Sequence, residues 1–349
     1  PPPASSSAAS DVYKRQSPIL KIIILGERME LVIVGSAGYD DIETPVGKVS
    51  GLLGGSAIYS GLSAAFHARD IGLQRLSVGI VSIVGEDFDP DSERKLRQSG
   101  LDLRGLKRSM LPTFRWSGRY EGSMDHAETV STELNSLSDF NPDFPSGWKN
   151  PEIVFCSSAS PKSQNSVLDA NQEALVTALD TFALWIEEDF HGLSEALRKV
   201  DIAIFNEDEV NRIGSDSNYM VSAHKIMSGE SLDGGELVGP GPDCLIVKRG
   251  SAGCVCIHRD GVITLPAYPT TKIVDPTGCG DVFAGAFLAQ LVPLRGRIAD
   301  IESIRRALVH ATVTASFSIE SFGTDAIANL KRGKYRARLD KFRRMVGII

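Results

Sequence analysis

Short apolar runs alternate with amphipathic stretches along most of the chain from residue 30 onward. The runs are typical of strands buried on both faces of a parallel sheet. We predict strands over Leu31–Val34, Leu76–Val84, Ile153–Cys156, Ala174–Leu179, Ile202–Phe205, Leu245–Val247 and Gly253–His258. We predict helices over Ala57–Arg69, Pro90–Ser99, Trp185–Val200, Asn218–Met227, Asp281–Leu291 and Ile301–Phe317. This alternation predicts an α/β fold in which helices cover both faces of a mostly parallel sheet.

Two segments, near 41–53 and 110–137, break this alternation. Both carry β-forming residues and turn glycines where a crossover helix is expected. We therefore predict that they form extra strands, as a small sheet placed over a cleft. Because exposed strand edges tend to pair, we also predict a homodimer through these strands.

The first residues of the chain have a different composition from the rest. Residues 1–17 are rich in Pro, Ser and Ala, and they contain too few apolar residues to offset the cost of ordering. Met29 directly precedes the first predicted strand. We expect residues 1–28 to be a disordered or foreign tail and residues 29–349 to form one domain.

The charge balance argues against polyanionic partners. The chain has 37 Lys and Arg residues and 44 Asp and Glu residues, a formal net charge of −7, so no global positive field attracts nucleic acid. The segment 331–344 carries eight basic residues and one acidic residue, which we interpret as a solvated terminal helix. No nucleic-acid partner is expected.

Neither a membrane span nor a disulfide framework is predicted. The longest uncharged apolar run, Val282–Leu294, is interrupted by Gly, Gln and Pro and falls short of the ~20 apolar residues that a spanning helix needs. Five scattered cysteines indicate a reducing compartment, so we expect a cytoplasmic protein without membrane partners.

The stretch Val274–Leu288, VDPTGCGDVFAGAFL, carries the clearest chemical signal. Its glycines stand where a helix begins, so backbone amides can converge on an anion there without a Cβ in the way. A dinucleotide fingerprint needs a third glycine where Phe283 stands, and no GK pair is followed by Ser or Thr as in a P-loop. A plain helix start capped by Asp281 remains the alternative from local chemistry.

This stretch resembles the second signature of the ribokinase-like (PfkB) carbohydrate kinases, which reads roughly Asp-Thr-x-Gly-Ala-Gly-Asp-x-Phe. The matching residues are Asp275, Thr277, Gly278, Gly280, Asp281 and Phe283. Cys279 stands where Ala is usual and Pro276 where Thr is common. Further motifs follow the family order: Asp40 in GSAGYDD, LGGSA over 53–57 and Asn-x-x-Glu over 206–209. The resemblance covers residues 30–325 and implies a three-layer α/β/α sandwich with a small β lid.

Within the family, the blocks GSAGYDDIETPVGKVSGLLGGSA, TFRWSGRYEG and ALDTFALWI look most like a poorly characterised sugar-kinase subgroup. The Asn that often follows the glycine pair is absent, because Ile58, Tyr59 and Ser60 stand there. This departure argues against the common furanose sugars as substrates.

The resemblance implies a catalytic group at the start of the last core helix. Asp281 would be the base that accepts the hydroxyl proton. The amides of Gly278, Cys279 and Gly280 would hold the transferred phosphate. For the acceptor, Asp40 at the end of the first strand would accept hydrogen bonds from neighbouring hydroxyls.

The remaining implied residues contact the two substrates. Gly54 and Gly55 would let the acceptor lie against the backbone, and Arg115 on a lid strand is a further acceptor contact. Asn206 and Glu209 would hold Mg²⁺ through water. Lys248 and Gly250 would contact the nucleotide.

The function implied is an ATP-dependent, Mg²⁺-requiring kinase that phosphorylates a hydroxyl of a small sugar or related polyol. A cyclitol or a nucleoside remains open as acceptor, and a monovalent cation is a further candidate cofactor. A nucleoside kinase and a catalytically silent sugar- or nucleotide-binding module are the alternative functions.

Overall fold

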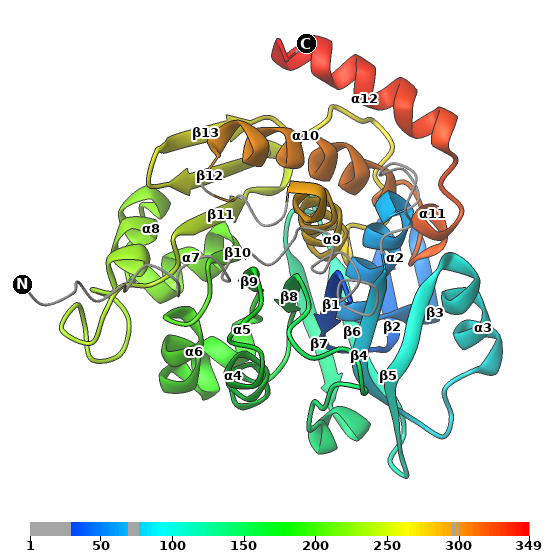
Figure 1. Cartoon of the computed structure of the whole chain (residues 1–349). Helices are drawn as coiled ribbons and strands as arrows, with labels where there is room; N and C mark the ends of the chain where they lie inside the picture. Colours follow the sequence, from blue (N-terminus) through cyan, green and yellow to red (C-terminus); the bar gives the residue numbers. More distant parts are fainter. Residues whose placement is uncertain (1–28, 69–76, 295–297, 299, 349) are drawn as a thin grey trace, which may run out of the picture.

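The computed structural model describes residues 29–68, 77–294, 298 and 300–348 (Figure 1). The predicted tail over 1–28 lies outside the described residues, as do the end residues of two predicted elements, Arg69 and Leu76.

A nine-stranded sheet forms the centre of the molecule, in the order β13-β12-β11-β10-β9-β8-β1-β4-β5 (Figure 1). Its strands are β1 (Leu31–Val34), β4 (Val78–Gly85), β5 (Leu101–Ser109), β8 (Ile153–Cys156), β9 (Val176–Leu179), β10 (Ile202–Asn206), β11 (Cys244–Lys248), β12 (Cys254–His258) and β13 (Gly261–Leu265). Neighbours from β11 to β5 pair in parallel, whereas β12 and β13 are antiparallel. The mostly parallel sheet is confirmed.

Helices cover both faces of this sheet, and β1 shows why. Leu31 and Ile33 point into one core, and Val32 and Val34 point into the other. The first core is closed by α2 (Ser56–Ala68), α3 (Pro90–Ser99), α9 (Cys279–Leu291), α10 (Ile301–Ser318), α11 (Asp325–Ala328) and α12 (Arg332–Val346). The second is closed by α4 (Pro161–Ala170), α5 (Ala183–Glu188), α6 (Phe190–Leu197), α7 (Glu207–Gly214) and α8 (Tyr219–Ser228). Burial on both faces explains the continuous apolar strands.

The two segments that break the alternation form a second sheet, in the order β3-β2-β6-β7. Its strands are β2 (Gly38–Thr44), β3 (Gly47–Gly54), β6 (Phe114–Tyr120) and β7 (Ala127–Glu133). β2 pairs in parallel with β6, and both hairpins are antiparallel. Most residues of the outer strands β3 and β7 are exposed. Dimerisation through these strands stays a prediction.

Some elements differ from the prediction for identifiable reasons. The stretch 185–200 is two helices, because the Asp189 carboxylate accepts a hydrogen bond from the Gly192 amide and starts α6. The strands β5 and β13 were not predicted, since both lie at sheet edges and carry polar residues. Helix α4 was missed because its sequence, PKSQNSVLDA, is mostly polar. Helix α9 begins two residues before the predicted start at Asp281.

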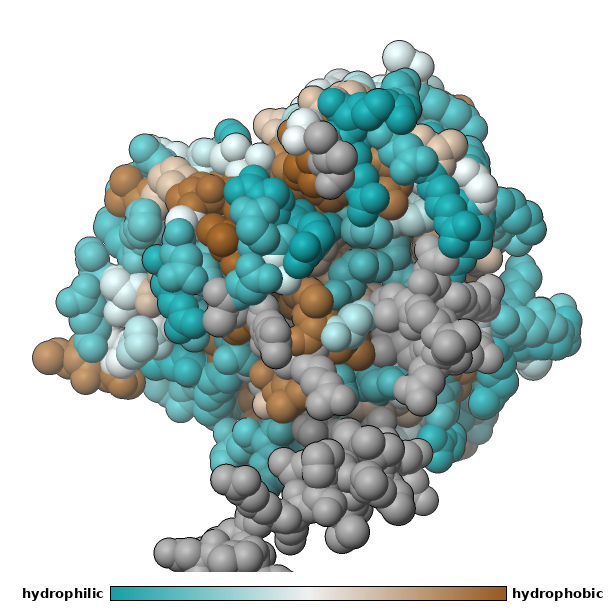
Figure 2. Space-filling view, turned by 45° about the horizontal axis from the view of Figure 1, so that its top comes forward, coloured by the Kyte–Doolittle hydropathy of each residue, from teal (hydrophilic) through white to brown (hydrophobic). Residues whose placement is uncertain are grey.

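The basic C-terminal segment forms most of α12. This helix buries Tyr335, Leu339 and Phe342 against the core, and its remaining positions are exposed or partly exposed. Figure 2 shows a largely hydrophilic face with small separate hydrophobic patches. None of the helices in the described part of the chain is both long and apolar enough to cross a membrane.

The helices α2 and α9 lie in close contact, and this contact positions the site. A Cβ on Gly285 of α9 would lie 2.0 Å from the carbonyl oxygen of Ser60 in α2. The Ser63 hydroxyl of α2 donates to the carbonyl oxygen of Val282 at 2.6 Å. A glycine is therefore required where the two backbones meet, and the two helices begin beside the same cavity.

Candidate active site

A cavity of about 300 Å³ lies at the edge where the central strands end. Successive strands each contribute a residue from their carboxyl end or just beyond it: Ser36 from β1, Ser158 from β8, Asp180 from β9, Asn206 from β10 and Lys248 from β11. The carboxyl ends of parallel strands are where α/β folds usually bind ligands. The starts of α2 and α9, one face of β6, Asp40 of β2 and Ala127 of β7 also line the cavity.

The start of α9 is built by glycine. Gly278 is the N-cap residue and has a φ of 68°, and a Cβ on it would lie 2.4 Å from the Tyr59 ring. No side chain among the described residues caps α9, so the alternative in which Asp281 caps the helix is wrong. The Cys279 amide donates to the carbonyl oxygen of Pro276 at 3.1 Å, so this amide is already used within the turn. Gly278 and Gly280 line the cavity beside the positive end of the α9 dipole.

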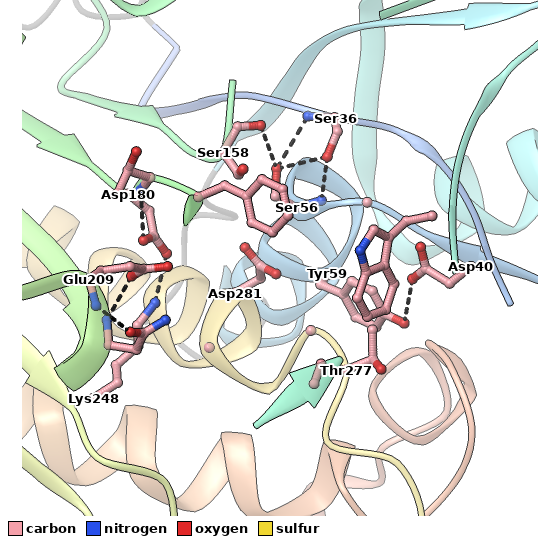
Figure 3. A pocket seen from close by; sticks show the side chains of 18 of the residues that line it. Ser36, Asp40, Ser56, Tyr59, Ser158, Asp180, Glu209, Lys248, Thr277 and Asp281 are labelled. Atoms are coloured by element: carbon pink, nitrogen blue, oxygen red, sulfur yellow. Dashed lines mark hydrogen bonds and ion pairs between the residues drawn. The ribbon is translucent and has the colours of Figure 1, made fainter. Parts of the chain in front are cut away.

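Asp281, in the first turn of α9, lies between the two ends of the cavity (Figure 3). Its carboxylate has no hydrogen-bond partner among the described residues. Enclosure by the protein raises the pKa of Asp281 well above its usual value; the charge of Asp180 raises it further, and Lys248 opposes both. In its ionised form this carboxyl group, unengaged and facing a cavity, can accept a proton from a ligand hydroxyl, and the raised pKa makes the carboxylate a stronger base.

Asn206 and Glu209 bind each other at the start of α7. The Asn206 Oδ1 accepts from the Glu209 amide, and the Glu209 carboxylate accepts from the Asn206 amide, both at 2.8 Å. Burial raises the pKa of Glu209 to about 7, and the charge of Asp180 adds to this shift. In the described residues, no group of three or more His, Cys, Asp and Glu side chains could hold a metal. A Mg²⁺ ion at Asn206 and Glu209 would therefore have to be held mainly through its own water.

Lys248 supplies a positive charge beside the α9 turn. Its Nζ lies 2.8 Å from Oδ2 of Asp180, and a Cβ on Gly280 would lie 3.1 Å from the same Nζ. Burial alone would lower the pKa of Lys248, but the carboxylates of Asp180 and Glu209 outweigh it and raise the pKa to about 12. The ammonium group is thus charged at neutral pH.

Asp40 marks the other end of the cavity. The prediction that it ends the first strand is wrong, because β1 ends at Val34 and Asp40 lies within β2 of the small sheet. Its side chain is buried, and Tyr59 donates to Oδ2 at 3.3 Å. Burial raises the pKa of Asp40 to about 7, with a contribution from the charge of Asp275.

The glycine pair next to Asp40 has two different roles. A Cβ on Gly54 would lie 2.0 Å from Oδ2 of Asp40, so Gly54 makes room for this carboxylate and does not line the cavity. Gly55 does line the cavity, with a φ of 97° and a Cβ direction blocked at 2.6 Å by the carbonyl oxygen of Ser36. Only Gly55 fits the predicted backbone contact with a ligand.

An aromatic wall faces Asp40 from β6. Phe114, Trp116 and Tyr120 occupy alternate positions of this strand and all line the cavity. A Cβ on Gly118 would lie 2.0 Å from the Trp116 ring, so the ring lies across this glycine. The Tyr120 hydroxyl accepts from the Thr277 hydroxyl at 3.0 Å, which links the wall to the α9 turn.

Arg115, predicted as an acceptor contact, does not line the cavity. Its guanidinium lies 5.2 Å from the centre of the Tyr39 ring and 4.0 Å from the Asp87 carboxylate. Side chains alternate along a strand, so Arg115 faces away from its neighbours Phe114 and Trp116.

Two further predicted residues also lie outside the cavity lining. Gly250 has a φ of 51°, and a Cβ on it would lie 2.6 Å from the carboxylate of Asp125, at the tip of the β6–β7 hairpin. The Cys279 thiol lies 3.7 Å from the carbonyl oxygen of Ala315, and burial raises its pKa to about 11. These residues shape the turns around the cavity.

The sequence reasoning missed the segment Asp180–Phe182, whose three residues all line the cavity. A signal was available, because Asp180 directly follows the predicted strand Ala174–Leu179, at the edge of the sheet where α/β folds usually bind ligands. The Oγ1 atom of Thr181 has no hydrogen-bond partner in the described part of the chain. The aromatic wall was missed because the strand face was not assigned.

The fold is that of a ribokinase-like kinase, as two solved structures show. A nucleoside kinase from Methanocaldococcus jannaschii aligns with a TM-score of 0.66 at 21% identity, covering 90% of this chain and 99% of its own. A ribokinase from Giardia lamblia aligns with a TM-score of 0.71 at 20% identity, with the same coverage.

The sequence comparisons then define the family. The model of the pfkB family of carbohydrate kinases matches residues 60–331, and the chain belongs to this family of phosphotransferases with a hydroxyl acceptor. A cytidine kinase from Thermococcus kodakarensis is 28% identical over 270 residues, which cover 75% of this chain and 88% of the relative. An inositol 3-kinase from Arabidopsis thaliana is 43% identical over 49 residues, which cover 14% of each chain.

Proposed function

We propose that this chain is an ATP-dependent, Mg²⁺-requiring kinase that transfers the γ-phosphoryl group to a hydroxyl of a small, uncharged sugar or related polyol. One observation carries the proposal. A single cavity brings together the carboxylate of Asp40, the carboxylate of Asp281 at the α9 turn and the ammonium group of Lys248.

Each of these groups has a defined task in phosphoryl transfer to an alcohol. The acceptor hydroxyl lies beside Asp281, which takes its proton. The start of α9 at Gly278 and Gly280 holds the transferred phosphoryl group, and Lys248 neutralises its charge. Asn206 and Glu209 would hold Mg²⁺ through water, and the ion would supply further neutralisation of phosphate charge.

The charges of the lining favour an acceptor without a charge of its own. The described lining holds four carboxyl groups, those of Asp40, Asp180, Glu209 and Asp281, against one ammonium group, that of Lys248. This ammonium lies at the end of the cavity away from Asp40, here called the donor end because the phosphate donor would bind there, and it is paired with Asp180. A sugar phosphate or sugar acid would find no cationic side chain of the described lining at the Asp40 end, whereas a polyol can donate hydroxyls to Asp40.

A nucleoside is the second candidate acceptor, and two observations favour it. A relative that aligns over 75% of this chain is a cytidine kinase. In addition, the rings of Phe114 and Trp116 line the cavity and could stack with a nucleobase. The ribose hydroxyls would then bind Asp40.

The test is ADP release from ATP and Mg²⁺ in the presence of a panel of sugars, inositols, nucleosides and sugar phosphates. We expect turnover with a neutral polyol or a nucleoside, none with sugar phosphates, and loss of turnover when Mg²⁺ is chelated. Repeating the best reaction with and without K⁺ tests the monovalent cation. Binding by calorimetry without ADP release across the panel would identify a silent binding module and overturn the proposal.

A further inference from the structure

Asp180 forms a buried ion pair with Lys248 across the intervening strand β10. Asp180 directly follows β9, Lys248 ends β11, and β10 lies between these strands in the sheet. The Asp180 side chain is 6% exposed and the Lys248 side chain is 18% exposed, with 2.8 Å between Oδ2 and Nζ. Figure 3 shows this contact at the donor end of the cavity.

The Asp180 carboxylate is itself held in place. Its Oδ1 accepts a hydrogen bond from the Thr181 amide at 2.9 Å. Its backbone carbonyl accepts from the Gln164 side chain at 2.9 Å. Asp180 is therefore fixed through both backbone and side chain, and only Oδ2 is turned toward Lys248.

Lys248, in contrast, has a long flexible side chain that needs a partner to hold one position. Glu209 already accepts from the Asn206 amide at 2.8 Å, so Asp180 is the carboxylate that fixes the ammonium group by direct contact. The position so fixed lies beside Gly280, where a Cβ would come within 3.1 Å of Nζ. A cation held there faces the turn that carries Asp281.

We propose that Asp180 is a positioning residue for phosphoryl transfer: its carboxylate holds the Lys248 ammonium against the α9 turn, where the ammonium neutralises the moving phosphoryl group. This inference rests on the proposed function, because it takes the α9 turn as the phosphoryl site. In this role Asp180 acts through Lys248 and needs no contact with either substrate.

A double-mutant cycle tests this dependence. We expect Asp180→Asn and Lys248→Met each to lower kcat by about 10- to 100-fold, since a displaced or missing cation loses charge stabilisation in the transition state. Because Asp180 acts through Lys248, the kcat of the double variant should lie within about 3-fold of the kcat of the slower single variant. The KM of the acceptor should change little in all three variants.

Controls separate positioning from folding. Asp169→Asn removes an ion pair with Lys199 of the same 2.8 Å length outside the cavity, and its kcat should equal that of the wild type. The double variant should melt above Asp180→Asn, because the single variant leaves a buried ammonium group unpaired. Should Asp180→Asn not fold, Asp180→Glu, which keeps the charge but displaces it, replaces it in the cycle.

Two outcomes would overturn the inference. One is a double variant whose fold-loss of kcat equals the two single fold-losses multiplied together, which would mean that Asp180 acts independently of Lys248. The other is a rise in the Mg²⁺ concentration for half-maximal rate in Asp180→Asn but not in Lys248→Met, which would make Asp180 a metal contact. If no acceptor is found for the wild type, the proposed function fails, and the same cycle measured on ATP affinity by calorimetry still tests the coupling.

Discussion

The two ends of the cavity are built from different parts of the fold and offer a ligand different groups. At the donor end, Asp180 and Lys248 follow or end buried parallel strands and form an ion pair, while the side chains of Asn206 and Glu209 each accept a hydrogen bond from the other's backbone amide. At the acceptor end, β6 of the half-exposed small sheet offers an aromatic surface, and Asp40 on the neighbouring strand β2 supplies a carboxyl group.

From this difference we expect the donor end to determine the rate of phosphoryl transfer and the acceptor end to determine which acceptor binds. The donor end has little freedom, because its charges are fixed by mutual contacts and by a sheet buried on both faces. The acceptor end depends on β6 and β2 of the small sheet, and Trp116 on β6 is only partly buried, so a substitution there changes the cavity with little effect on the two cores of the central sheet. We therefore expect substitutions at the donor end and at Asp281 to change turnover, and substitutions on β6 to change the choice of acceptor.

The largest effect is expected at the junction of the two ends. Asp281→Asn should lower kcat by at least ~100-fold, because the amide cannot accept the hydroxyl proton. Its affinity for ATP, measured by calorimetry, should stay within about 2-fold of the wild type. Turnover equal to that of the wild type would show that Asp281 takes no part in the mechanism. It would also contradict the expectation that turnover depends on the donor end and Asp281.

A pH-dependent effect on stability is expected at Asp40. The unfolded chain loses this proton near the usual value of 3.8, whereas the folded protein holds it up to a pKa of about 7, so the wild type loses stability as pH rises through this window. At pH 8, the free energy of unfolding of Asp40→Asn should exceed that of the wild type by about 2 kcal/mol, which is half of the largest gain that this pKa shift allows at about 1.36 kcal/mol per pKa unit. Near pH 3 the two free energies should be equal. Urea unfolding at several pH values measures the difference, and parallel curves would contradict the prediction.

Next in size is the effect of the aromatic wall on the acceptor. Trp116→Ala should raise the acceptor KM about 10-fold, because a stacked ring contributes roughly 1 kcal/mol beyond its area, and should leave the KM for ATP unchanged. Gly118→Val should act in the same direction, since a Cβ there displaces the Trp116 ring. Thr129→Val is the matched control, because it removes only the hydrogen bond from Trp116 Nε1 at 3.3 Å. A larger change in the KM for ATP than in that for the acceptor would contradict the division.

The smallest effect is expected at Arg115. Its side chain packs on Tyr39 outside the cavity, so Arg115→Ala should change kcat and both KM values by less than about 2-fold. Steady-state kinetics with the best acceptor provide the measurement. A large rise in acceptor KM would show that Arg115 turns inward when the ligand binds.

The central sheet was predictable because burial on both faces leaves a strong pattern. The runs Leu31–Val34 and Ile153–Cys156 are strands with the predicted bounds. The strand β5 and the helix α4 were not predictable in this way, because their many polar residues weaken the hydrophobic periodicity that identifies a strand or a helix. Pattern alone also cannot place the break at Asp189, which depends on one side-chain hydrogen bond.

The site was predictable where a motif fixes the backbone and not where tertiary contacts choose a face. Gly278, Gly280 and Asp281 line the cavity because a helix start after glycine has few alternative geometries. On β6, by contrast, the sequence names both Arg115 and Trp116, and only the packing of the small sheet decides that Trp116 faces inward. The position of Asp180 after a strand could be read from the sequence, but its pairing with Lys248 depends on the sheet order, in which β9 and β11 flank β10.

The direct backbone contact between Gly285 and Ser60 has a consequence for attempts to redesign this enzyme. Because α2 and α9 are in direct backbone contact there, neither can be shifted or re-angled alone, and a bulkier residue at position 285 would push apart two walls of the cavity. New acceptor preferences are therefore best introduced through the strands of the small sheet, with the two helices left untouched as a fixed frame.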